Sequence, residues 1–143
     1  HMTKKIFRYE PLLHVFKIFV EILTSYLLIY EYLFRYVFWS FGATRPTFEH
    51  SPPVVTVDAM HLRGAYKGKG IVAMVQTANG RIVPVAYAII DEESTHSWYW
   101  FLKYLKKYIL RRRVTCIISD RHKGILAAIE KLDEKFPGWG VHR

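Results

Sequence analysis

Residues 12–41 form a long apolar and aromatic stretch in which polar side chains recur at regular intervals. On a helix, with about 100° per residue, these polar side chains fall on one narrow stripe. Two oppositely charged pairs have the i,i+4 spacing that stabilises a helix. The pattern predicts one long helix, or two short ones, with a wide apolar face. The polar stripe consists of His14, Lys17, Glu21, Thr24, Ser25, Glu31 and Arg35.

The wide apolar face of this predicted helix must be covered. Packing on its own domain or on a partner subunit is one explanation, and insertion into a membrane surface is the other. The stretch has no charge-free run of the roughly 20 residues that a spanning helix needs. Residues 42–53 contain one Gly and three Pro residues, which predict a loop. We therefore expect an apolar helical segment at residues 3–45, ahead of a domain at residues 46–143.

After this loop the pattern changes to short runs rich in β-branched residues, at residues 54–62, 70–78 and 81–90. Asn79-Gly80 separates the last two runs, and Asn-Gly between β-type runs is a strong hairpin signal because both residues tolerate positive φ. The three runs therefore predict an antiparallel meander. Pro84 removes one hydrogen-bond donor from the third strand, which favours a place at the edge of the sheet.

The remaining sequence predicts two helices around one strand. In residues 94–110 the apolar side chains recur at i, i+3, i+4 and i+7, and Ser94 or Thr95 can cap the start. Residues 114–120 read as an apolar strand, and residues 122–135 as a second helix that ends at Pro137. The order β-β-β-α-β-α predicts an α/β domain with a mixed sheet flanked by helices.

The composition adds information about partners. The chain carries 21 Lys and Arg against 12 Asp and Glu, a formal excess of +9, and most of the excess lies after residue 51. A basic domain favours polyanions such as nucleic acid or an anionic membrane surface, although a solvated basic face is also common. Cys116 is the only cysteine, so neither an internal disulfide nor a cysteine-based zinc site can form within the chain.

Two acids stand out because each follows or interrupts an apolar strand. Asp58 lies within the first predicted strand, and Asp120 ends the strand after the first helix. In this order the two strands can lie side by side in parallel. Two carboxylates on neighbouring strands offer oxygen ligands to Mg²⁺, and a pair of such ions can promote cleavage of a phosphodiester. The alternative is structural: Asp58 caps a bend and Asp120 caps a helix.

Three stretches of the sequence, "VDAMHLRG", "EESTHSWYWFL" and "SDRHKG", together resemble the transposase domain of plant Mutator-like elements, the MULE transposases. The resemblance covers roughly residues 38–143. It implies a ribonuclease H-like fold and a DDE-type triad that uses Mg²⁺ or Mn²⁺ for cut-and-paste DNA transposition. By this resemblance Asp58 and Asp120 match the first and second acids, and both are expected metal ligands and catalytic residues.

Basic residues follow each of the two acids. His61, Arg63 and Lys67 come after Asp58, and Arg121, His122 and Lys123 come directly after Asp120. We expect these six residues to contact nucleic-acid phosphates at the edge of the site. The alternative is an ordinary solvated surface.

The resemblance also implies parts that this sequence does not contain. The family continues into a Cys/His-bearing segment and a third acid, whereas the chain ends at His142-Arg143. Glu130, Asp133 and Glu134 have helical spacing and polar neighbours, so we expect them to lie on a solvated face.

Three functions follow from these observations. The favoured hypothesis is a transposon-derived fragment that is catalytically incomplete and acts as a protein- or DNA-interaction module, either with a partner protein or as a homo-oligomer. The second is a Mg-dependent transposase or nuclease that is active only in a longer protein or assembly. The third is a small membrane-associated protein that binds through residues 12–41. The resemblance implies a nuclear location.

Overall fold

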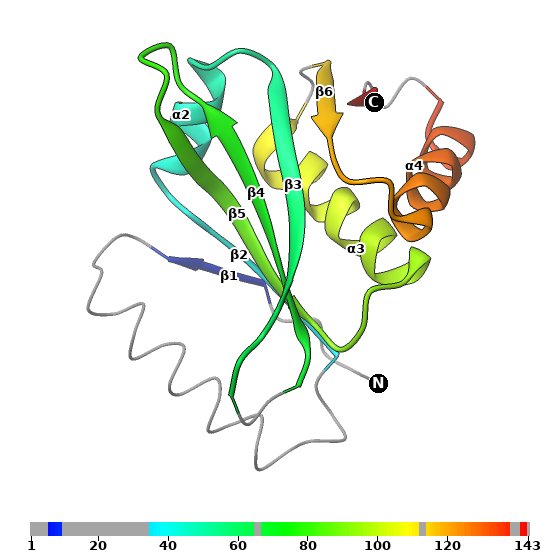
Figure 1. The fold of residues 1–143 in the computed structure, drawn as a ribbon. Helices are drawn as coiled ribbons and strands as arrows, with labels where there is room; N and C mark the ends of the chain where they lie inside the picture. Colours follow the sequence, from blue (N-terminus) through cyan, green and yellow to red (C-terminus); the bar gives the residue numbers. More distant parts are fainter. Residues whose placement is uncertain (1–5, 10–34, 65–66, 112–113, 138–140, 143) are drawn as a thin grey trace.

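The computed structural model of the chain describes residues 6–9, 35–64, 67–111, 114–137 and 141–142. These residues form a mixed sheet with the strand order β1-β2-β5-β4-β3-β6-β7 (Figure 1). Three helices and one π-helical turn accompany the sheet within the described ranges. The strands are β1 (Ile6–Tyr9), β2 (Tyr36–Phe41), β3 (Val54–His61), β4 (Lys69–Gln76), β5 (Ile82–Ile90), β6 (Thr115–Ile118) and β7 (Val141–His142); the helices are α2 (Thr44–Glu49), α3 (Thr95–Leu105), η1 (Lys106–Leu110) and α4 (Lys123–Lys135).

The predicted antiparallel meander is confirmed as β3, β4 and β5, each antiparallel to the next. The hairpin between β4 and β5 turns at the expected place. Gly80 has a φ of +75° and its N–H donates to the carbonyl of Thr77 at 2.9 Å. Asn79 does not have a positive φ, so the reversal spans three residues, and its glycine alone takes the left-handed conformation.

The prediction that Pro84 lies in an edge strand is wrong. Its strand, β5, lies between β4 and β2 in the sheet. The pairing with β2 covers only Tyr87–Ile90, however, so Pro84 occupies the half of β5 that β2 does not flank. On the other side it pairs with Met74, next to a register irregularity between Ala73 and Met74. A proline within a strand is tolerated at such irregularities.

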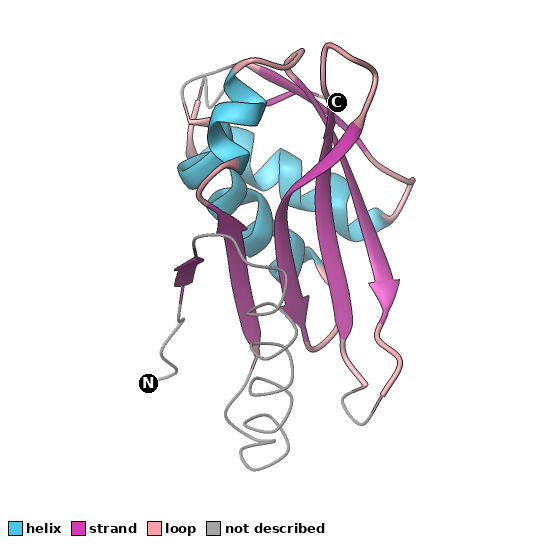
Figure 2. Cartoon of the chain, turned by 90° about the vertical axis from the view of Figure 1, so that its left-hand side faces the viewer, coloured by secondary structure: helices cyan, strands magenta, loops and turns pink. Residues whose placement is uncertain are grey.

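The expected parallel pairing of the first strand with the strand after the helix is confirmed. β3 and β6 pair in parallel, with Val54 opposite Cys116 and Thr56 opposite Ile118. The chain returns to β3 through α3, which covers one face of the sheet together with α4 (Figures 1 and 2). This pairing is the feature that brings Asp58 and Asp120 to the same end of the sheet.

The core lies between the sheet and these two helices. Alternate strand residues point into it, and α3 contributes the largest side chains. Burial of one such side chain stabilises the fold by about 1.5–3 kcal/mol. The residues that define this layer are Val55, Val57, Ala73, Val75 and Ile117 from the strands, Trp98, Phe101, Leu102 and Leu105 from α3, and Ile125, Ala128 and Leu132 from α4.

The predicted helix at residues 94–110 forms, and its start and end are both specified locally. Ser94 accepts from the N–H of Ser97, and the Ser97 hydroxyl accepts from the N–H of Ser94, which makes a capping box. The last turn is π-helical, and the chain leaves it at Arg111, which has a φ of +52°. The second helix, α4, also matches its prediction.

The helical prediction for residues 3–45 is wrong where the structure describes the chain. Ile6–Tyr9 and Tyr36–Phe41 are strands that pair with each other in parallel, and β2 also pairs with β5. Val37, Phe38 and Trp39 are all buried, so neither a helical nor a strand period is visible in this run. The rest of the predicted helix, at residues 10–34, lies outside the described residues.

The prediction of a loop at residues 42–53 is also wrong in part, because Thr44–Glu49 form the short helix α2. Pro46 lies in its first turn, where its missing N–H leaves no helical hydrogen bond unmade. Arg45 and Glu49 form an i,i+4 ion pair at 3.2 Å, and Phe48 is buried. Among the described residues, no helix has the length and hydropathy needed to cross a membrane.

Candidate metal and nucleic-acid site

Asp58 projects from β3 away from the two covering helices. Its neighbours Val57 and Val55 point into the core, so alternation along the strand places Asp58 on the opposite face. The side chain is exposed, and its Oδ1 accepts a hydrogen bond from the N–H of Ala59 at 2.9 Å. This contact is local, so the second carboxylate oxygen can serve as a ligand.

Asp120 lies two residues beyond the end of β6 and is exposed. Because Thr56 and Ile118 are partners in the parallel ladder, Asp58 and Asp120 each come two residues after the same rung. Oδ1 of Asp120 accepts from the N–H of His122 at 3.2 Å. The alternative role as a helix cap is wrong, because the N-cap of α4 is His122.

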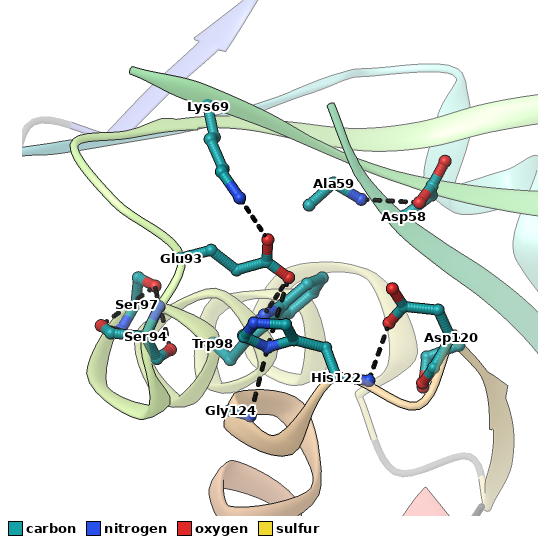
Figure 3. Close-up of polar contacts among 11 residues, drawn as sticks. Asp58, Ala59, Lys69, Glu93, Ser94, Ser97, Trp98, Asp120, His122 and Gly124 are labelled. Carbon is teal, nitrogen blue, oxygen red and sulfur yellow. Dashed lines mark hydrogen bonds and ion pairs between the residues drawn. The ribbon is translucent and has the colours of Figure 1, made fainter. Parts of the chain in front are cut away.

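The parallel pairing brings the two strands that carry these acids side by side, but each carboxylate contacts only its own segment of the chain. The dashed lines from Asp58 and Asp120 in Figure 3 run to Ala59 and His122, not toward a shared point. Within the described residues, no three His, Cys, Asp or Glu side chains are grouped so that they could hold a metal ion.

A third acid, Glu93, is the centre of a polar cluster beside this end of the sheet. It lies between β5 and α3, and its side chain is only 9% exposed. Oε2 accepts from Lys69 Nζ at 2.7 Å, and Oε1 accepts from Trp98 Nε1 at 3.1 Å. Oε1 also lies 3.4 Å from Nδ1 of His122. Figure 3 shows Lys69, Trp98 and His122 converging on this one carboxylate.

The surroundings of Glu93 favour its charged form. Burial acts to raise the pKa of Glu93, but hydrogen bonds from Lys69 and Trp98 and the charges of His122 and Lys69 outweigh burial. The net result is a pKa below the ordinary value of 4.5. A largely buried carboxylate that is paired in this way remains ionised at neutral pH.

His122 links the Glu93 cluster to Asp120. Its backbone N–H donates to Asp120, and its Nδ1 accepts from the N–H of Gly124 at 3.1 Å, which caps α4. The same Nδ1 lies 3.4 Å from Oε1 of Glu93, so the ring lies between the start of α4 and this carboxylate.

The comparisons with known proteins point to one family. A family model described as the MULE transposase domain matches residues 54–142, more than half of the chain. The chain belongs to this family. No curated protein and no solved structure matches it. The resemblance that the three sequence stretches indicated is thus confirmed for the region that contains the acids and their basic neighbours.

Within the MULE domain, the basic residues predicted to bind DNA lie around the same end of the sheet. His61 ends β3, and Arg63 and Lys67 lie in the connection to β4. Arg121 and Lys123 flank His122 at the start of α4. Five of these residues are exposed, and His122 is half-buried, with 37% of its side chain exposed. Their positions agree with either a phosphate-binding role or a solvated surface.

Glu93 is the residue of the MULE domain that the sequence reasoning missed. It is the last of three acids in "DEES" before the capping serine, where an acid is expected simply because it favours a helix start. Two features of the sequence could have singled it out. Trp98 follows it by five residues, and Lys69 starts the strand that forms a hairpin with β5. The late acids Glu130, Asp133 and Glu134 are exposed on α4, as predicted.

Proposed function

We propose that the chain is a DNA-interacting module of a Mutator-like transposase, in which Asp58 and Asp120 are two of the metal ligands of a DDE-type site. The observation that carries this proposal is the parallel pairing of β3 with β6, because it places both acids two residues beyond one rung. The family match at residues 54–142 supports it. A nuclear location would follow from this role.

We also infer a ribonuclease H-like fold for residues 54–142. Its support is the arrangement of the strands: an antiparallel meander, a crossover through α3, and a fourth strand that returns to lie parallel with the first. A short fifth strand, β7, then extends the sheet in parallel beside β6.

The two acids fit the chemistry of a hard cation. Each offers carboxylate oxygen, the ligand type that Mg²⁺ and Mn²⁺ prefer, and each is accessible from solvent. Such ions, when bound, activate an attacking oxygen and stabilise the leaving oxygen of a phosphodiester. The residues of this chain would hold the ions and, through Arg63, Lys67 and Arg121, position the DNA backbone. Among the described residues, no third acid is grouped with these two.

Calorimetry with Mn²⁺ tests the proposal on the purified chain. We expect binding to the unaltered chain and none to the Asp58→Asn/Asp120→Asn variant. The control is Glu130→Gln/Asp133→Asn, which removes two exposed acids from α4 and should leave binding unchanged. Binding that persists in the Asp58/Asp120 variant, or no binding to the unaltered chain, contradicts the assignment.

A second candidate function is an interaction module without catalysis. It is favoured by the hydrogen bonds of the two acids, since one oxygen of each carboxylate already accepts a backbone N–H. This function predicts DNA or protein binding that is unchanged by chelators and by Asp58→Asn/Asp120→Asn. If the exposed cations contact phosphates, affinity for DNA should fall steeply as salt is raised. A flat response to salt would favour a protein partner or a homo-oligomer.

A further inference from the structure

We propose that Glu93 is a positioning residue for Asp120, and that it acts through His122. The inference deepens the proposed function and rests on it, since Asp120 matters most as a metal ligand. It assigns a role to an acid that the triad does not include.

The first step is the location of Glu93 where three elements meet. Lys69 comes from the start of β4, Trp98 from the first turns of α3, and His122 from the N-cap of α4. A single carboxylate that accepts hydrogen bonds from Lys69 and Trp98 and contacts the ring of His122 fixes the relative positions of these elements. Its side chain is 9% exposed, so solvent offers little replacement for a lost partner.

The second step is the short connection from His122 to Asp120. The backbone N–H of His122 donates to Oδ1 of Asp120, so the position of residue 122 sets the direction of the carboxylate. The segment between β6 and α4 has little other support, because Asp120 and Arg121 are both exposed. The imidazole ring of His122, which is 37% exposed and lies 3.4 Å from Oε1 of Glu93, connects this segment to the buried framework.

The third step is the tight packing around this anchor. A Cβ at Gly124 would lie 3.0 Å from Nδ1 of His122 and 3.2 Å from the carbonyl carbon of Ser94. The start of α4 is therefore pressed against the start of α3, next to Glu93. A ring held in this space has few alternative positions. Outer partners that orient a metal ligand in this way typically change metal affinity by about 10–100-fold when they are removed.

Amide hydrogen exchange tests the positioning directly, without any metal. In Glu93→Gln we expect a larger loss of protection at the amides of His122 and Gly124 than at Ala73 in the central ladder, whose amide reports the change in global stability. The matched control is Glu92→Gln, which removes the neighbouring exposed acid and should change neither region. Unchanged protection at His122 and Gly124 would overturn the proposal. A uniform loss across the whole sheet would also overturn it, because it would show that Glu93 only stabilises the fold.

Mn²⁺ affinity tests whether the effect reaches Asp120 through His122. We expect Glu93→Gln to weaken binding by roughly tenfold. His122→Asn keeps a good N-cap residue but cannot reach Glu93, and it should weaken binding similarly. The double variant should be no weaker than the single ones, because both changes break the same link. Additive losses would mean that Glu93 does not act through His122.

The two proposals fail in different ways. If the unaltered chain binds no Mn²⁺, the proposed function is wrong, while the exchange data still decide whether Glu93 holds the Asp120 segment. If the unaltered chain binds Mn²⁺ and loses it in Asp58→Asn/Asp120→Asn, but Glu93→Gln binds equally well, the proposed function stands and the positioning role is wrong.

Discussion

Two neighbouring regions of the domain treat their carboxylates in opposite ways. At the junction of β4, α3 and α4, Glu93 is largely buried and receives its partners from three separate elements. Asp58 within β3 and Asp120 beyond the end of β6 are exposed, and each receives one hydrogen bond from a backbone N–H of its own segment. The first acid is part of the folded framework, whereas the other two keep oxygen atoms available to a ligand.

The difference teaches that acids of one domain can have two distinct uses. A carboxylate surrounded by donors stabilises the structure but has little capacity left for a cation. An exposed carboxylate with one local hydrogen bond contributes little to stability and keeps an oxygen atom accessible to a cation. The four predictions below test this division, beginning with the largest expected effect.

Trp98→Ala should lower the free energy of unfolding by about 3–5 kcal/mol. The side chain is 1% exposed in the core, and its Nε1 also donates to Glu93. Urea denaturation measures the effect. Trp98→Phe keeps most of the ring but loses the hydrogen bond, and it should be clearly less damaging. Equal losses in the two variants would mean that the bond to Glu93 outweighs the packing.

Glu93→Gln should lower the free energy of unfolding by about 1–3 kcal/mol, because it leaves the charge of Lys69 without its partner. The side chain of Lys69 is 25% exposed, so water compensates only in part. Glu92→Gln is the matched control and should change stability by less than about 0.5 kcal/mol. Chemical denaturation of both variants at neutral pH gives the comparison, and equal stability of the two would refute the framework role of Glu93.

The stability difference between the unaltered chain and Glu93→Gln should depend on pH in acid. Because the pKa of Glu93 is lowered in the folded state, its contribution is fully present above its ordinary value of 4.5 and is lost as pH falls through the folded value. The stability difference should therefore be constant from neutral pH down to about pH 4.5, and it should decrease as the pH falls further. Thermal unfolding at a series of pH values measures it, and a difference that grows in acid would contradict the sign.

Asp58→Asn and Asp120→Asn should each change the free energy of unfolding by less than about 0.5 kcal/mol, since both side chains are exposed. Added Mn²⁺ should raise the melting temperature of the unaltered chain but not that of these variants. A large loss of stability in either variant without metal would place that acid with Glu93 in the framework.

The sequence predicted the structure best where a local pattern is compatible with a single type of structure. The Asn79-Gly80 turn, the apolar spacing of residues 94–110 and the parallel partner of β3 could all be predicted, and the family resemblance picked out Asp58 and Asp120. The failures have physical causes. β2 is buried on both faces, so its residues show no period, and the pairing of Ile6–Tyr9 with β2 is a non-local contact that local patterns do not record.

The cluster around Glu93 was not predictable for a related reason. Lys69, Glu93 and His122 are far apart in the chain and have no shared spacing, and each looks ordinary in its own segment. The pairing of β4 with β5 brings Lys69 to Glu93, and the packing of α3 against α4 brings His122 there. The three acids in "DEES" all precede a helix, where any acid is favourable. The sequence therefore does not show which of them is buried.

The parallel pairing of β3 with β6 has a consequence for how the site assembles. The segment between Asp58 and Asp120 contains β4, β5 and α3, so the two acids come to neighbouring strands only after a long loop has closed. Contacts of such high sequence separation generally form slowly. A nascent or partly folded chain would carry both acids but keep them apart until β6 had paired with β3.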